Sequence, residues 1–352
     1  MIGTVTAVLK HIKADLAQVL DAPTILALCH EAGYPWRPRL LDPVTTVHLF
    51  ILQILHGNTA CSHLPHLAGQ RFTASAYCQA RTRLPLGVWQ QLLRRTTASL
   101  DQTTQDAGRW RGHRTFLVDG SSFSMSDTPE LQEHFGQPGG QRPGCGFPVA
   151  HLLALFHTGT GFLMEVVADP WHTHDMARVT SIHPTLRPGD VLVGDRAFCS
   201  FAHLALLRQQ HLHGLFRVPQ KQIVDFTPAR PHTTPKPQAA QKGRPRSRWL
   251  RQLGVTDQLV EWVKPMRPPV HPPAWMTPDL FAAFPAMLCV RELRYHGAQA
   301  GFRTQTVTLV TTLLEADLYP ADALADLYSR RWQVEISQLH YGSRESLSLA
   351  AA

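Results

Sequence analysis

The chain has 352 residues, of which 44% are hydrophobic and 17% charged, and this composition excludes a mainly disordered chain, a collagen and a coiled-coil rod. The length predicts two or three domains. Lys and Arg outnumber Asp and Glu by 34 − 26 = 8 residues, which favours a polyanionic partner such as nucleic acid, although a basic enzyme without such a partner fits the charge equally well.

Membrane insertion and secretion are not indicated. No stretch approaches the roughly 18 uninterrupted apolar residues of a membrane span, and the first residues lack the charge-then-apolar order of a signal peptide. No two cysteines form a CxxC pair, which argues against a zinc finger and against a disulfide framework. We therefore expect a cytoplasmic protein with no membrane partner.

The first part of the chain, residues 1–108, is predicted to be all helical. Apolar residues recur at helical spacing in 5–19, 45–55 and 88–93, and prolines separate these segments. Arg81 and Arg83 precede a predicted helix end, where they are either solvated or placed to contact phosphate.

The pattern changes to strands after Arg109. Residues 115–119 form a short apolar run that ends at Asp119 before a glycine, which is typical of a buried strand that delivers a carboxylate to its end. Apolar runs at 147–156 and 161–168 predict paired strands. The glycine-rich stretch between them and Asp119 is followed by no GK[ST], so a loop is favoured over a phosphate-binding P-loop.

The cluster His172, His174 and Asp175 has two interpretations. Such residues could bind a metal ion, but surface loops often carry them without one, and we favour the loop.

A second strand–acid pattern occurs at 190–195, where a short apolar run ends at Asp195. An apolar helix is predicted to follow at 200–210, and the strand–acid–helix order is typical of α/β proteins.

The segment 218–305 differs again in composition. It is rich in proline, and residues 217–251 hold many basic side chains and only one acid, Asp225. Strand-like runs lie at 259–263, 287–293 and 306–312. We expect an inserted β-rich segment with a basic, extended arm, and DNA contact is favoured over a merely solvated loop.

The last predicted element is a helix over 320–339. Tyr328, Arg331 and Glu335 stand at i, i+3 and i+7 and so share one face of it. On spacing alone, an ordinary amphipathic helix with a surface ion pair between Arg331 and Glu335 is favoured.

Three acids stand out together: Asp119, Asp195 and Glu335. Carboxylates at the carboxyl ends of neighbouring parallel strands meet at one edge of a sheet, where α/β proteins place their sites. Converging carboxylates repel one another unless a cation neutralises them, and Mg²⁺ prefers oxygen ligands and accepts substrate phosphate. Two such ions support phosphodiester transfer without a covalent protein intermediate.

These residues carry a resemblance to the DDE transposases of bacterial insertion sequences, in the large group named after insertion sequence four. The family signature is Tyr, two residues, Arg, three residues, Glu, six residues, Lys, and Tyr328, Arg331 and Glu335 match it in residue and spacing. Further similarity lies in Asp119-Gly-Ser-Ser-Phe-Ser, Gly144-Cys-Gly-Phe-Pro148 and Val193-Gly-Asp-Arg-Ala-Phe-Cys-Ser200.

The resemblance implies an α/β fold in which a ribonuclease-H-like catalytic core is interrupted by a β-rich insertion and preceded by a helical N-terminal domain. The expected boundaries are a DNA-binding domain at 1–108, the first part of the core at 109–217, the basic insertion at 218–305 and a truncated second part of the core at 306–352.

The resemblance also implies site residues, a cofactor and partners. Asp119, Asp195 and Glu335 become the catalytic, metal-binding triad for Mg²⁺, with Mn²⁺ as a substitute. Tyr328, Arg331 and Arg196 become contacts to DNA phosphates. The implied partners are double-stranded DNA, both transposon ends and target, and a second copy of the chain in a homodimer on DNA, in the bacterial cytoplasm at the nucleoid. Three tryptophans are candidates to stack on a flipped base, or merely pack: Trp249, Trp262 and Trp275.

The end of the chain departs from the family. The signature lysine should fall at position 342, where the sequence has Gly342, and the text after Gln338 no longer resembles the family. We interpret this as a frameshift or early stop. Two alternatives to an active Mg²⁺-dependent transposase follow: an inactive truncated remnant that binds DNA without catalysis, and a hydrolase of another class that uses the surface around His172 and His174.

Overall fold

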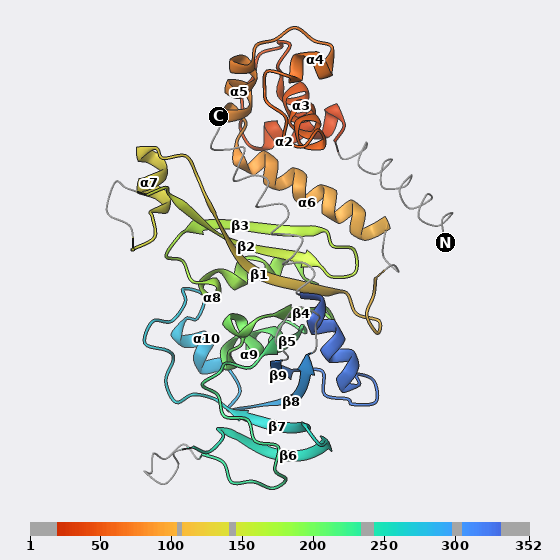
Figure 1. Ribbon diagram of the computed structural model, residues 1–352, viewed down its shortest axis with the longest axis vertical. Helices are drawn as coiled ribbons and strands as arrows, with labels where there is room; N and C mark the ends of the chain where they lie inside the picture. The colour runs from red at the N-terminus through yellow and green to blue at the C-terminus, as the bar shows by residue number, and fades with distance from the viewer. Residues whose placement is uncertain (1–19, 104–107, 141–145, 234–242, 298–304, 332–352) are drawn as a thin grey trace. The chain divides into compact units, whose positions relative to one another are not determined.

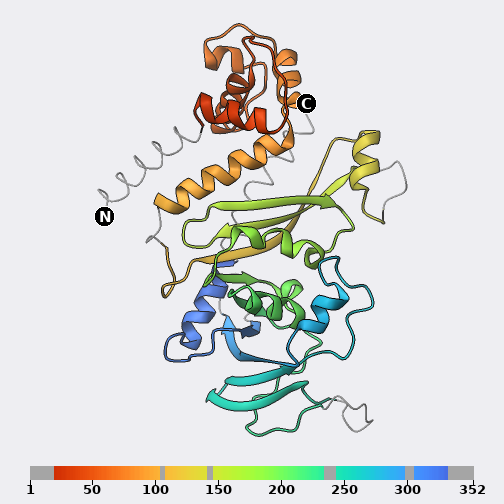
Figure 2. The same cartoon turned by 180° about the vertical axis from the view of Figure 1, so that it is seen from behind.

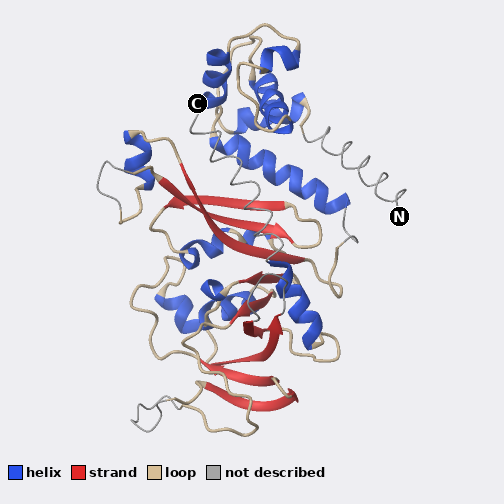
Figure 3. Cartoon of the chain, in the orientation of Figure 1, coloured by secondary structure: helices blue, strands red, loops and turns tan. Residues whose placement is uncertain are grey.

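The computed structural model describes residues 20–103, 108–140, 146–233, 243–297 and 305–331, which separate into two compact units at the boundary between Ala107 and Gly108. The regular elements described before that boundary are all helices, and the described strands all lie after it (Figure 3). Among the described residues, no helix is both long and apolar enough to cross a membrane.

The N-terminal unit is built from helices whose starts the sequence encodes. Asp21 and Asp42 each accept a hydrogen bond from a backbone N–H of the first turn, at 2.8 and 2.7 Å, which satisfies a donor that the helix itself leaves open. The apolar faces of these helices form two small cores, one around Ile25 and Val47 and one around Leu64. The helices are α2 (Ala22–Glu31), α3 (Pro43–Leu55), α4 (Leu64–Ala68), α5 (Ala74–Arg83) and α6 (Leu86–Thr103).

Two predictions for the N-terminal unit concern the helix at 5–19 and the side chains of Arg81 and Arg83. The predicted helix at 5–19 lies outside the described residues. Arg81 is half-buried: its guanidinium lies 5.9 Å from the ring centre of Phe50 and 5.6 Å from that of Tyr77, and it donates a hydrogen bond to Gln53 Oε1 at 3.3 Å. Arg81 therefore packs against the core of this unit, whereas Arg83 donates to the side chain of exposed Gln79.

The strands described in the second unit form one nine-stranded sheet in the order β3-β2-β1-β4-β5-β9-β8-β7-β6 (Figure 1). Only β1, β4 and β5 run parallel to one another, and the remaining pairings are antiparallel. The strands are β1 (Thr115–Ser124), β2 (Val149–His157), β3 (Leu163–Pro170), β4 (Val191–Gly194), β5 (His213–Arg217), β6 (Ser247–Gly254), β7 (Asp257–Val263), β8 (Met287–Gly297) and β9 (Gln305–Thr311).

Helices cover both faces of this sheet (Figures 1 and 2). One core contains the helix α9 and the side chains of Phe116, Val118 and Leu192. The other core contains Leu117 and Val193 and is covered by residues 321–331 of a helix that continues to the end of the described chain. The labelled helices are α7 (Pro129–Phe135), α8 (Asp175–Arg178), α9 (Phe201–Gln209) and α10 (Pro278–Ala283), with short 3-10 turns at Val179–Ser181, His183–Thr185 and Arg196–Phe198.

The mixed α/β architecture with a large sheet is confirmed, and two details differ from expectation. β1 continues beyond Asp119 to Ser124, because β2 pairs with it along its whole length. The part of the basic stretch that was expected to extend as an arm includes β6, which pairs with β7 at the edge of the sheet. The inserted strands are therefore a continuation of the core sheet, joined to it where β9 pairs with β5.

Candidate nucleic-acid cleavage site

Asp119 and Asp195 are brought side by side by strand register. In the parallel pair of β1 and β4, Leu117 faces Val193 and Val118 faces Gly194, so continuing the register by one residue sets Asp119 beside Asp195. Because side chains alternate across a strand, both carboxylates share the face of Leu117 and Val193. The two predicted strand acids therefore meet on one face of the sheet.

The backbone after β4 is fixed by Asp195 itself. Its Oδ1 accepts a hydrogen bond from the N–H of Ala197 at 2.7 Å, which caps the 3-10 turn Arg196–Phe198. Asp195 thus caps this turn through Oδ1. Arg196 is exposed next to it, as a residue that contacts a polyanion must be.

The helix 321–331 delivers two more predicted residues to the same face. Tyr328 is buried among the apolar side chains of this core, and Arg331 Nη1 lies 3.8 Å from Asp119 Oδ1. The guanidinium of Arg331 is 5.7 Å from the ring centre of Tyr328, as expected for residues three apart on a helix. Glu335 lies outside the described residues.

The pKa of Tyr328 is affected by its burial and by charged side chains that lie close to it. Burial raises the pKa of the Tyr328 hydroxyl, the positive charges of Arg331 and Arg217 lower it, and the negative charge of Asp195 raises it again. The phenol is therefore neutral at ordinary pH and lies within electrostatic reach of two arginines and one carboxylate.

Arg217 lies on the same face as the two acids, a position that the sequence did not reveal. It ends β5, and the register of β5 with β4 sets it beside Asp195 on the same face, one strand further along. In the sequence it looked like the first residue of the basic arm. The signal that could have found it is its position two residues after buried Leu215, but the neighbour it meets depends on strand order.

The donor chemistry of this face fits a hard divalent ion. Two carboxylates on adjacent strands offer the oxygen ligands that Mg²⁺ prefers, and their mutual repulsion favours a cation between them. Among the described residues, no group of three or more His, Cys, Asp or Glu side chains is arranged to hold a metal ion. Asp119 and Asp195 can therefore supply two carboxylate ligands, and any further carboxylate must come from outside that part of the chain.

Two members of the histidine cluster, His174 and Asp175, have partners outside the cluster. His174 caps α8 through Nδ1, which accepts the N–H of Met176 at 3.2 Å. Asp175 instead turns to His151 on β2, whose Nε2 is 2.6 Å from Asp175 Oδ1. These two side chains therefore take part in a helix cap and in a contact with a neighbouring strand.

The three candidate tryptophans have different surroundings. Trp262 is buried and donates to Glu292 at 2.8 Å, and Trp275 donates to the carbonyl of Met176 at 2.8 Å. Both are used in packing and hydrogen bonding within the unit. Trp249 on edge strand β6 is partly exposed and stays a candidate for stacking on a base.

The chain is similar in sequence to a protein of Escherichia coli. The InsZ protein of Escherichia coli K12, which is named as a transposase, is 30% identical over 152 residues, and the match covers 41% of this chain and 48% of InsZ. The chain thus spans about half the length of this relative.

Solved structures give more distant similarities. A piggyBac transposase synaptic complex with hairpin DNA matches with 9% identity and a TM-score of 0.41, covering 92% of this chain and 66% of that one. A Mos1 transposase paired-end complex matches with 12% identity and a TM-score of 0.21, covering 51% of this chain and 60% of that one.

The widest sequence match is to a family. The pattern of the transposase DDE domain matches residues 110–342, which is well over half of the chain and contains Asp119, Asp195, Tyr328 and Arg331. The chain therefore belongs to the transposase DDE domain family.

Proposed function

We propose that the chain is a DNA transposase that cleaves phosphodiester bonds at insertion-sequence ends and transfers the freed strand to target DNA. The observation that carries the proposal is the meeting of Asp119, Asp195 and Arg331 on one face of the sheet, from two strands and a helix that lie far apart in the sequence. Glu335, four residues after Arg331, is proposed as the third carboxylate of the triad.

The site's own residues divide the work by charge. Asp119 and Asp195 supply oxygen ligands for Mg²⁺, or Mn²⁺ in its place, and the bound ions would activate the attacking oxygen and stabilise the leaving one. Arg331, Arg217 and exposed Arg196 present positive charge on or next to the same face, which suits DNA phosphates.

Each unit offers a basic hollow in addition to this site. In the N-terminal unit, Arg37, Arg39 and Arg83 line an open cavity of about 600 Å³. In the second unit, Lys221, Arg244 and Arg246 line one of about 690 Å³ beside the start of α9. Both support a domain organisation in which the helical unit, 1–108, and the basic insertion, 218–305, hold duplex DNA while the core, 109–217 and 306–352, performs the chemistry.

The second candidate is a remnant that binds DNA without cleaving it. The observation that favours it is Gly342, which stands where the family's signature has lysine. This alternative predicts the same binding surfaces and no reaction, so binding and cleavage must be measured separately. A homodimer on DNA, located at the nucleoid, is proposed for either case.

The test uses the full chain and a labelled duplex made from the DNA that flanks its coding sequence. We compare Asp119→Asn and Asp195→Asn with the control Asp317→Asn, which removes an exposed carboxylate just before the helix 321–331. Cleavage in Mg²⁺ or Mn²⁺ should fall to background in both site variants, while binding persists and the control cleaves like the unaltered chain.

The outcomes separate the candidates. Full cleavage by either site variant would refute the assignment of the carboxylates. Tight, ion-independent binding with no cleavage by the unaltered chain would establish the binding-only remnant instead.

A further inference from the structure

We propose that Arg291 of β8 is a positioning residue for this reaction. It anchors Tyr319, the residue just before the helix 321–331, and so sets where Arg331 lies relative to Asp119. The inference rests on the proposed function, because the role of the helix in the reaction is itself proposed.

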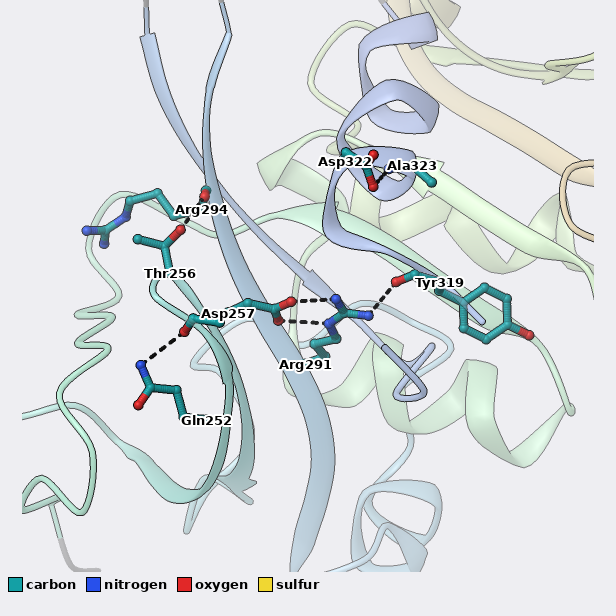
Figure 4. A network of polar contacts seen from close by, with 9 residues as sticks. Gln252, Thr256, Asp257, Arg291, Arg294, Tyr319, Asp322 and Ala323 are labelled. Atoms are coloured by element: carbon teal, nitrogen blue, oxygen red, sulfur yellow. Dashed lines mark hydrogen bonds and ion pairs between the residues drawn. The ribbon is translucent and has the colours of Figure 1, made fainter. Parts of the chain in front are cut away.

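The side chain of Arg291 is held on all its nitrogens. It is 1% exposed, and its Nε and Nη2 donate to the two carboxylate oxygens of Asp257 on β7 at 2.8 and 2.5 Å. The remaining nitrogen, Nη1, donates to the backbone carbonyl of Tyr319 at 2.6 Å (Figure 4). A planar guanidinium fixed by a two-point contact on one side presents its third nitrogen in a defined direction.

The segment before β1 also contacts this turn. Arg111 Nη1 donates to the carbonyl of Leu318 at 2.9 Å, and His113 Nε2 lies 2.8 Å from the Tyr319 hydroxyl. The rings of Trp110 and Tyr319 stack with their centres 5.8 Å apart. The start of the helix is therefore tied both to the strand that carries Asp119 and to the inserted strands β7 and β8.

Attachment at two points matters because a small change in the direction of the helix at Tyr319 becomes a larger displacement at Arg331. A helix rises about 1.5 Å per residue, so Arg331 lies about 15 Å from the start of the helix at Ala321. A change of a few degrees in direction at Tyr319 therefore moves Arg331 by about 1 Å, and a misplacement of this size costs about a hundredfold in rate. Arg291 thus acts at a distance through the direction of the helix.

The competing explanation is that Arg291 and Asp257 form only a structural ion pair. The chain offers a matched control for this, because Arg114 and Asp190 make a second buried two-point pair, at 2.9 and 2.5 Å, at the start of β1 and β4. A purely structural role predicts that the two pairs behave alike when weakened.

The experiment compares Arg291→Lys with Arg114→Lys in the full chain. Lysine keeps the charge but loses the planar fork, so it cannot hold the carboxylate at two points and also reach the Tyr319 carbonyl. Hydrogen exchange of the backbone amides in 321–331 is followed by mass spectrometry, at denaturant concentrations that match the overall stability of the two variants. Exchange in this helix should be at least about tenfold faster in Arg291→Lys than in Arg114→Lys.

Cleavage kinetics give the second measurement. With saturating duplex, Arg291→Lys should lower the rate constant by about tenfold to a hundredfold with the KM for DNA unchanged, and Arg114→Lys should not. If the unaltered chain cleaves nothing, the proposed activity fails, while hydrogen exchange still decides whether Arg291 seats the helix.

Equal exchange in 321–331 for the two lysine variants would overturn the proposal. Should Arg291→Lys not fold, Asp257→Asn against Asp190→Asn carries the same comparison, because the amide keeps the shape of the carboxylate and weakens only its hold on the guanidinium. Equal exchange in that second pair would overturn the proposal in the same way.

Discussion

Arg331 places its Nη1 3.8 Å from Oδ1 of Asp119, although one residue ends the described part of a helix and the other lies on the first strand of the sheet. The two side chains are only 12% and 14% exposed, so this contact is screened less than a surface ion pair. The positive charge of Arg331 is therefore close enough to offset part of the negative charge of Asp119.

Replacing Arg331 by alanine should weaken DNA binding through the loss of one phosphate contact. We expect the slope of log affinity against log salt to become shallower by about 1 for the duplex that flanks the coding sequence. Arg330→Ala is the matched control, since it removes the same charge from the adjacent position, which points about 100° away around the helix. Fluorescence anisotropy over a salt series measures both variants. Equal changes for the two would show that only net charge matters and that Arg331 makes no specific contact.

Gly120→Ala should destabilise the second unit because no room exists for the added methyl group. A Cβ on Gly120 would collide with Oδ1 of Asp175, which is itself held by His151. Overpacking of this kind costs about 1–3 kcal/mol in the free energy of unfolding. Urea denaturation should show that loss, and Gly139→Ala, whose added methyl would meet open space, should show almost none.

A double variant tests the cause of that loss. Adding Asp175→Ala to Gly120→Ala should restore part of the stability, because the clashing carboxylate is gone. If the two losses simply add, the methyl group added at position 120 is accommodated in another way and the close packing of β1 against α8 does not limit this position.

A pair of buried histidines, His183 and His203, should make the fold sensitive to acid. His203 Nδ1 donates to the carbonyl of Phe198 at 2.7 Å, so its Nε2 accepts, and Nε2 of His183 donates to it at 3.2 Å. Burial lowers the pKa of His183 to about 4 and that of His203 to about 3. Both are therefore neutral in the folded protein at ordinary pH.

The sign follows from proton uptake. Below the ordinary histidine pKa of about 6.5, the unfolded chain binds protons that the folded chain does not, so stability falls as the pH drops from 6.5 towards 4. For each of these two buried histidines, the free energy of unfolding should fall by about 2 kcal/mol between pH 6.5 and pH 5. Urea denaturation should show a smaller acid loss in His183→Gln, which keeps a donor towards His203. An identical pH dependence in both chains would exclude this pair as the cause.

The strands and the helix that carry the site could be predicted because short-range signals specify them. The apolar runs ending at Asp119 and Asp195 are β1 and β4, and the spacing of Tyr328 and Arg331 did indicate one helix face. Two acids that end parallel strands lie side by side when the strands are neighbours in matching register, as β1 and β4 are here. Local pattern and the chemistry of carboxylates were sufficient for this part of the site.

What lies beside each strand could not be predicted, because sheet order depends on contacts that no local pattern reports. Arg217 lies beside Asp195 only because β5 is the neighbour of β4, and the sequence alone grouped it with the basic arm. The anchoring of Tyr319 by Arg291 depends in the same way on where β8 lies in the sheet. Strand β6 was missed because its exposed basic residues hide the alternation that marks a strand.

The position of β9 between β5 and β8 has a consequence for how the molecule is made. The chain leaves the parallel strands after β5, forms three antiparallel strands, and only then supplies the strand that joins them to the rest. Such distant pairing is slow to form, because closing a long loop costs entropy before any contact rewards it. The helix 321–331, which packs over the face that Asp119 and Asp195 share, follows β9 in the chain, so the covering of this face depends on the same distant pairing.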